Sequence, residues 1–321
     1  MPTDIAEVAP PAGLRRVGDG ALDWLERHLA WFDPFSPQAG ASAHGTSAHG
    51  KAKAALELAL LRHCWARTAD EGDPRFGRVT NLVRTLWRQP EVRRLVTAVP
   101  AQATYYGLVH AALDPDGPPD GTVLDRAAVD GLSPYLRLEL RYYGDQARAR
   151  HDIESYAELA ERNVLVTLPA VVRERAVPER TAPDGEPPVS IPQAYAVTHS
   201  SYYLTDFGRT APPLSAEQLT GARELVRAVL EHCVRRDWWD LAAELMMAQV
   251  CLGERPLDTP WGRDALACLA RAQRPDGAIP GRSANTAAPP SAPAGEFFAA
   301  AYHTTLVTAL MALLVSSAGA R

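Results

Sequence analysis

The chain has 321 residues, of which 46% are hydrophobic and 22% are charged, so it is long enough to bury a large core. Its 33 basic and 38 acidic residues give a formal net charge of −5 at pH 7. This balance provides no electrostatic reason to expect nucleic acid or an anionic membrane as a partner.

The composition indicates a cytoplasmic protein. We expect no membrane span and no secretory signal, since Met1–Leu14 lacks a basic start and an apolar stretch. Cys64, Cys233, Cys251 and Cys268 lie in apolar helical patterns without a Cys-x-x-Cys pair, which favours buried thiols in a reducing compartment. Only two of the 33 basic residues are lysines, a bias typical of a GC-rich, actinobacterium-like genome.

Apolar residues recur with helical spacing along nearly the whole chain, and no segment alternates as a strand does. We therefore predict an all-α fold in one domain, residues 1–321. The predicted helices are Ala21–Phe32, Ala52–Trp65, Arg78–Trp87, Tyr105–Leu113, Pro134–Tyr143, Ser155–Val172, Tyr195–Phe207, Ala216–Cys233, Trp239–Leu252, Trp261–Gln273 and Phe297–Val315.

Three segments of low apolar content, 36–50, 178–192 and 281–295, are predicted to be mobile loops that cover a cavity. The first repeats the tetrapeptide Ser-Ala-His-Gly and carries His44 and His49. Two histidines five residues apart lack the converging ligands of a metal site, so we interpret them as part of a solvated loop.

The C-terminal part carries a resemblance to a known superfamily. From Leu266 a helix ends at Gln273, the turn Arg-Pro-Asp-Gly follows, and a proline-rich loop leads to a helix that contains Tyr-His-Thr-Thr at 302–305. This pattern is similar to one repeat of the protein prenyltransferase and terpenoid cyclase superfamily. The resemblance implies an α/α toroid, in which inner and outer helices surround a central cavity. The segment Leu204–Gly208, Leu-Thr-Asp-Phe-Gly, is also similar to one in uncharacterised actinobacterial all-α proteins.

In the prenyltransferases the matching histidine binds zinc, so the resemblance implies His303 as a ligand of a divalent metal such as zinc. The chain lacks the Asp-x-Cys pair of those enzymes, the Asp-x-Asp-Asp motif of triterpene cyclases and the Asp-Asp-x-x-Asp motif of class I terpene synthases. The resemblance therefore implies a fold and a cavity, without these reactions.

Polar residues also share a face of the predicted helix Tyr195–Phe207. His199, Tyr202, Tyr203 and Asp206 follow at i, i+3, i+4 and i+7. They are candidates for catalysis, and His199 and Asp206 also for metal binding. The alternative is that they only satisfy backbone groups around an aromatic core.

Glu244 lies among leucines and methionines, where a carboxylate is costly unless it is paired, metal-bound or facing a wet cavity. It is our best carboxylate candidate, with an ion pair to an arginine as the alternative. Tyr106, His110 and Glu139 repeat this pattern and rank lower.

We expect Glu244, His303, and His199 or Asp206 to line one pocket. The first functional hypothesis is an enzyme of specialised metabolism that acts on a largely apolar small molecule, with these residues around a metal or as acid and base. The second is a non-catalytic protein that binds or carries an apolar metabolite. A helical scaffold for protein partners is a third.

Overall fold

The computed structural model describes residues 12–40, 47–68, 72–98, 102–117, 129–175 and 187–319. These residues form helices and no strand, with one isolated bridge between Trp238 and Ser283. The all-α prediction is therefore confirmed. The helices are α1 (Ala12–Arg27), α2 (Leu29–Phe32), α3 (Pro37–Gly40), α4 (Ala48–Trp65), α5 (Pro74–Trp87), α6 (Pro90–Thr97), α7 (Ala103–Ala112), α8 (Pro134–Gln146), α9 (Tyr156–Glu161), α10 (Val164–Arg175), α11 (Ile191–Thr205), α12 (Ala216–Arg235), α13 (Trp239–Cys251), α14 (Pro260–Ala272) and α15 (Ala294–Gly319).

Local sequence sets the helix starts. Serine side chains cap α9, α11 and α12 in capping boxes, in which Ser155, Ser190 and Ser215 pair with the third helical residue. Several helices begin with proline, whose missing N–H costs nothing in the first turn. The predicted helix Ser155–Val172 is divided into α9 and α10 at Asn163, because this buried side chain accepts from the backbone N–H of Leu165 and donates to Ser200.

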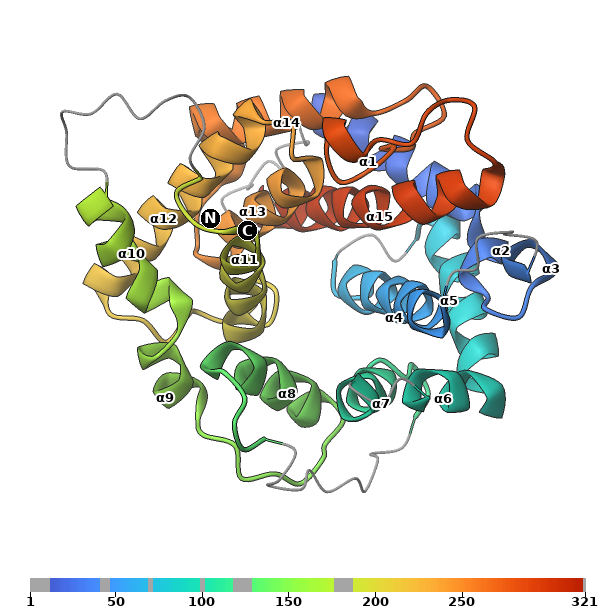
Figure 1. The fold of residues 1–321 in the computed structure, drawn as a ribbon, viewed down its shortest axis with the longest axis horizontal. Coiled ribbons are helices and arrows are strands. Elements are labelled where there is room, and N and C mark those ends of the chain that lie inside the picture. The colour runs from blue at the N-terminus through green and yellow to red at the C-terminus, as the bar shows by residue number, and fades with distance from the viewer. Residues whose placement is uncertain are drawn as a thin grey trace, which may run out of the picture.

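Six helices form a closed circuit around the centre of the molecule. In the order α4, α7, α8, α11, α13 and α15, each helix contacts the next, and α15 returns to contact α4 (Figure 1). Other helices cover this circuit from outside, since α1 packs on α15, α5 on α4, α6 on α7, α9 on α8, α10 on α11, and both α12 and α14 on α13. Residues distant in sequence therefore face one central space.

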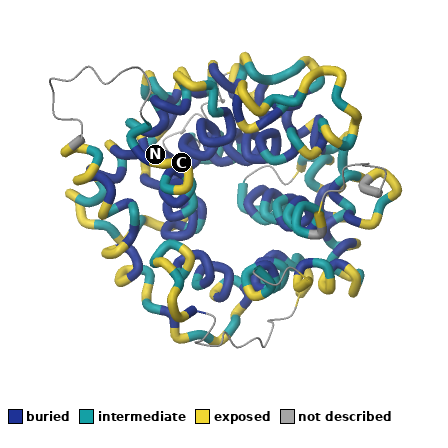
Figure 2. The backbone as a smooth tube through the Cα atoms, viewed as in Figure 1, coloured by how far each residue is buried: buried dark blue, intermediate teal, exposed yellow. Residues whose placement is uncertain are grey.

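Figure 2 shows buried residues along the inner helices, which the outer helices cover from one side. Every residue of α13 is buried. Helix α15 is long and apolar enough to cross a membrane, so our expectation that no such run exists is wrong. In the fold, however, 83% of its most apolar window is buried, as in the core helix of a water-soluble protein.

The structure describes the three predicted loops in part. Residues 41–46 and 176–186 lie outside the described part, as does His44. Helix α4 begins at Ala48, capped by Ser47, so the end of the first predicted loop is helical. Segment 281–293 is fixed to the start of α13, since the carbonyl of Arg282 accepts from the backbone N–H groups of Trp239 and Asp240.

The turn between α14 and α15 depends on a glycine. Gly277 is buried at φ +92°, and a Cβ built there would lie 1.9 Å from the carbonyl oxygen of Gly20 in α1. Gln273 joins the same two segments, because its amide donates to the carbonyls of Val17 and Gly277. The Pro-Asp-Gly turn therefore fixes the α14–α15 segment to α1.

We expect Gly277→Ala to lower the free energy of unfolding by at least about 2 kcal/mol, from backbone strain and the clash with α1. Gly77→Ala is the matched control. Gly77 lies exposed in α5 with no atom within 4 Å of the added Cβ, so this variant should gain about 0.5–1 kcal/mol in helix propensity. Urea denaturation measures both, and equal effects would contradict this role of the turn.

Candidate active site

A pocket of about 380 Å³ lies inside the circuit and is lined by side chains from all six inner helices. This volume is at the lower end of the roughly 300–1,000 Å³ typical of small-molecule sites. Seven of the ten tyrosines of the chain line it. One part of its wall is aliphatic, formed by Leu56, Leu60, Val109, Leu306, Val307 and Leu310.

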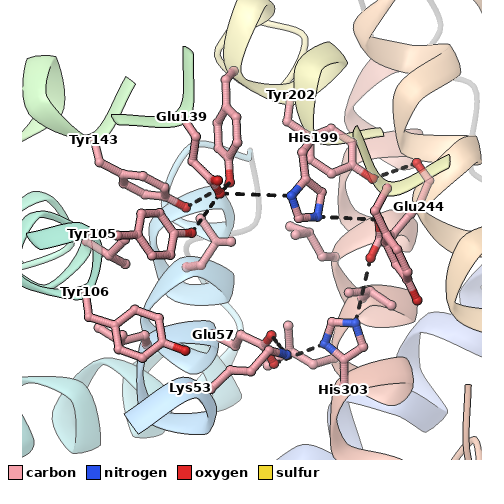
Figure 3. A pocket seen from close by; sticks show the side chains of 18 of the residues that line it. Lys53, Glu57, Tyr105, Tyr106, Glu139, Tyr143, His199, Tyr202, Glu244 and His303 are labelled. Atoms are coloured by element: carbon pink, nitrogen blue, oxygen red, sulfur yellow. Dashed lines mark hydrogen bonds and ion pairs between the residues drawn. The ribbon is translucent and has the colours of Figure 1, made fainter. Parts of the chain in front are cut away.

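Carboxylates and histidines alternate across the pocket (Figure 3). His199 lies between Glu139 and Glu244, with its Nδ1 4.0 Å from Glu139 Oε1 and its Nε2 3.7 Å from Glu244 Oε2. His303 lies between Glu244 and Glu57, at 3.7 Å from Glu244 Oε1 and 3.1 Å from Glu57 Oε2.

Lys53 extends the series, because its Nζ forms an ion pair with Glu57 one turn along α4. We call Glu139, His199, Glu244, His303, Glu57 and Lys53 the charge series. It draws on α8, α11, α13, α15 and α4, so the complete fold is needed to assemble it.

His303 and Glu57 form the shortest histidine–carboxylate pair of the charge series. Burial by itself lowers the pKa of His303, but the charges of Glu57 and Glu244 outweigh it and raise this pKa to about 9. Burial would raise the pKa of Glu57, yet His303 and Lys53 hold it at about 2. His303 is therefore an imidazolium at neutral pH, held between two carboxylates.

Glu244 is almost completely buried, with 3% of its side chain exposed. Burial would raise its pKa, but His303 and His199 lower it. Thr198 donates to Glu244 Oε2 at 2.7 Å, and the hydroxyl of Tyr202 donates to the main-chain carbonyl of Glu244 at the same distance. Glu244 is thus an oriented anion shared by two histidines.

His199 is the most accessible of the acid–base groups, with 31% of its side chain exposed. Its Nδ1 shares a hydrogen bond of 2.9 Å with the hydroxyl of Tyr135. No hydrogen bond holds its Nε2 among the described residues, where Glu244 lies at 3.7 Å. A ligand in the pocket therefore has direct access to this nitrogen.

The structure brings four predicted site residues together, because His199, Tyr202, Glu244 and His303 all line the pocket. It does not bring Asp206 there. Helix α11 ends at Thr205, and Asp206 has a left-handed backbone at φ +46°.

The Asp206 carboxylate turns away from the pocket to accept from Arg67 at 2.6 Å and from Tyr142 at 2.9 Å. The predicted stripe of four residues is broken because its last member lies beyond the helix. Phe207, also at positive φ, lines the pocket instead and stacks on Tyr202.

Sequence reasoning missed part of the site. Glu57 lies between Leu56 and Leu58 in an apolar helix, the same signal that singled out Glu244, and it was overlooked. His49 was interpreted as part of a solvated loop, but it lies in the first turn of α4, lines the pocket and shares a hydrogen bond with Tyr106. Glu139, ranked lower, belongs to the charge series.

The remaining candidates are structural. The four cysteines are free and buried, as predicted. His110 stacks on Trp87 at 4.7 Å and does not line the pocket. The described residues contain no group of three or more His, Cys, Asp or Glu side chains arranged to hold a metal ion.

Comparison with known proteins identifies the family. Residues 18–313 match the model of a domain of unknown function, DUF6895. Since the match spans most of the chain, the protein belongs to this family. No curated protein matches the chain, and no solved structure matches it.

The His303–Glu57 pair makes stability depend on pH. The pKa of His303 lies above its ordinary value of 6.5, so this stabilisation is complete below pH 6.5 and is lost as the pH rises through about 9. The pKa of Glu57 lies below 4.5, so its contribution is lost as the pH falls from 4.5 through about 2. We expect both contributions to be complete between pH 4.5 and 6.5.

Urea denaturation from pH 6.5 to 9 tests this expectation. The free energy of unfolding should fall across this range in the wild type, and His303→Gln should reduce the slope. His232→Gln is the control, because burial lowers the pKa of His232, which is therefore neutral throughout this range. A slope unchanged by His303→Gln would contradict the assignment.

Proposed function

We propose that this protein is an enzyme that moves protons to or from a small, largely apolar molecule bound in the pocket. The charge series carries this proposal. Glu139 and Glu244 are buried and Glu57 is partly buried, which is expensive in a helical core, and apolar residues would fill the same space more cheaply. Ionisable groups with strongly shifted pKa values cluster at functional sites.

His199 is the proposed proton-transfer residue. Its imidazole is the most exposed acid–base group of the series, and Glu139 and Glu244 lie on its two sides. Tyr135 would orient the ring through its hydrogen bond to Nδ1. His303, held between Glu57 and Glu244, supports the geometry of Glu244 from the far side.

We also propose that the fold is an α/α toroid related to that of the protein prenyltransferases and terpenoid cyclases. The closed circuit of inner helices and the outer helix on each of them support this proposal. We propose that the enzyme belongs to bacterial specialised metabolism and is cytoplasmic. The low lysine content is typical of a GC-rich, actinobacterium-like genome, and the free, buried cysteines suit a reducing compartment.

A metal-assisted version of the reaction would use the predicted ligands His199 and His303, with Glu244 in place of Asp206. Both histidines bind a protein oxygen through Nδ1 and face Glu244 through Nε2, which is how metal-binding histidines are commonly oriented. The 3.7 Å between each Nε2 and Glu244 exceeds the roughly 3.3 Å expected between two ligands of a tetrahedral zinc. A zinc ion here would act as a Lewis acid and displace the His303 proton.

The alternative function is a non-catalytic protein that binds or carries an apolar metabolite. The aliphatic wall and the tyrosines suit this function as well as they suit an enzyme. A carrier needs no acid–base residue at the ligand, however, so the charge series favours catalysis.

We expect His199→Gln to abolish turnover while the fold and ligand binding persist. Purified protein is incubated with a small-molecule extract of bacterial cells, and mass spectrometry follows compounds that decrease while others appear. Wild type and the control His232→Gln should convert a compound in molar excess over protein. A compound that stays bound to the protein in a 1:1 ratio and is not converted would support the carrier instead.

Elemental analysis of untagged protein distinguishes the metal-assisted mechanism from acid–base catalysis without a metal. Near-stoichiometric zinc that is lost in both His199→Ala and His303→Ala would support the metal-assisted reaction. Turnover that persists in protein treated with a chelator would support acid–base chemistry by the side chains alone. Unchanged zinc in both variants would place any metal outside this pocket.

A further inference from the structure

Each carboxylate near the pocket can be matched to its cations. Glu57 has Lys53 and His303. Glu244 has His303 and His199 on its two sides. Asp240, next to the pocket, accepts from Tyr195 at 2.5 Å and has Arg282 at 3.9 Å.

Glu139 differs from these carboxylates. Its Oε1 accepts from the hydroxyls of Tyr105 and Tyr203, both at 2.8 Å. The described residues provide no lysine or arginine ion pair to it, and the nearest basic group is His199 at 4.0 Å. None of their hydrogen bonds reaches Oε2. Only 7% of the side chain is exposed, and that part faces the pocket.

A carboxylate this deeply buried is stabilised weakly by neutral hydroxyl donors alone. The surroundings suit a positive charge, because Tyr105 and Tyr203 direct their hydroxyl oxygens toward Glu139 and Tyr143 packs edge-on against both rings, so no described lysine or arginine competes at this carboxylate. The aliphatic wall provides apolar surface for an uncharged body.

We propose that the ligand of this pocket is an organic amine, protonated at neutral pH, whose ammonium group binds Glu139 Oε2 and whose apolar body lies against the aliphatic wall. The inference rests on the proposed function, since it names the chemical class of the molecule on which His199 would act. An amine nitrogen at Glu139 lies beside the imidazole of His199, the group proposed to move a proton.

An anionic ligand fits this part of the pocket poorly. It would approach Glu139 with no unpaired lysine or arginine among the described lining residues to offset the repulsion, because Lys53 is paired with Glu57 and Arg282 with Asp240. A neutral alcohol would satisfy the hydrogen bond of Oε2 and leave the charge of Glu139 uncompensated.

Three probes of matched shape test the charge preference, namely phenethylamine, phenethyl alcohol and hydrocinnamate. Isothermal titration calorimetry of the full chain at pH 7 measures their dissociation constants. We expect the amine to bind at least tenfold more tightly than the alcohol, and the carboxylate to bind most weakly. Equal affinities, a preference for the carboxylate, or no detectable binding of the amine would overturn the proposal.

Glu139→Gln keeps the shape and removes the charge, so the preference for the amine over the alcohol should fall below threefold. Glu254→Gln is the control, because Glu254 is a half-buried carboxylate outside the pocket. A preference that persists in Glu139→Gln would place the ammonium elsewhere and overturn the assignment. If Glu139→Gln fails to fold, the relative affinities of the wild type for the amine and the alcohol still test the proposed ligand class.

The result is separable from the proposed catalysis. An amine preference without any His199-dependent conversion would leave the ligand class standing and make the protein a carrier. Conversion of a compound by His199 together with equal affinities for the three probes would overturn the ligand class alone.

Discussion

The cost of burying charge is the constraint on which the rest of this structure depends. Inner helices covered on both sides must be apolar, and α13 and α15 are so almost throughout. Glu244 lies on such a helix, and Glu57 and Glu139 line the same pocket from α4 and α8, where leaving water penalises the charged form of a carboxylate. The chain meets this cost by alternating carboxylates with histidines, so that each imidazole serves two anions. Replacing one member therefore changes its neighbours as well, since buried ionisable groups this close titrate together.

Tyrosine hydroxyls also offset the cost of burying these charged groups. Its ring fills space like an apolar side chain, while its hydroxyl supplies a donor without a formal charge. Tyr105 and Tyr203 satisfy one oxygen of Glu139, and Tyr135 orients His199. A pocket made this way remains apolar enough to receive an apolar body. It nevertheless holds its charged groups in fixed positions, as preorganised catalysis requires.

More of the fold than of the candidate site could be predicted from the sequence. Helical periodicity and capping residues such as Ser215 indicate the elements, because these signals are local. The pairing of Glu57 with His303 is not local, since 246 positions separate them, and only the closed circuit of helices brings them together. For Asp206, in contrast, the local pattern led to a wrong prediction. Spacing placed it on the face of His199, yet one left-handed residue turned it toward Arg67. His49 was missed because its tetrapeptide resembles a linker, whereas Ser47 caps a helix there.

The contact that closes the circuit of inner helices also completes the pocket. The contact between α15 and α4 joins the C-terminal helix to the N-terminal part of the circuit, and His303 and Glu57 pair across it. On the outer side Gly277 and Gln273 fix the turn before α15 to α1, so two independent contacts hold this junction. If the junction opened, Glu57 would keep Lys53 from its own helix but would lose His303, which would remain beside Glu244 of α13. The pairing of His303 with its second carboxylate therefore depends on the closed circuit of helices. This dependence couples the global fold to the chemistry of the pocket without any moving part.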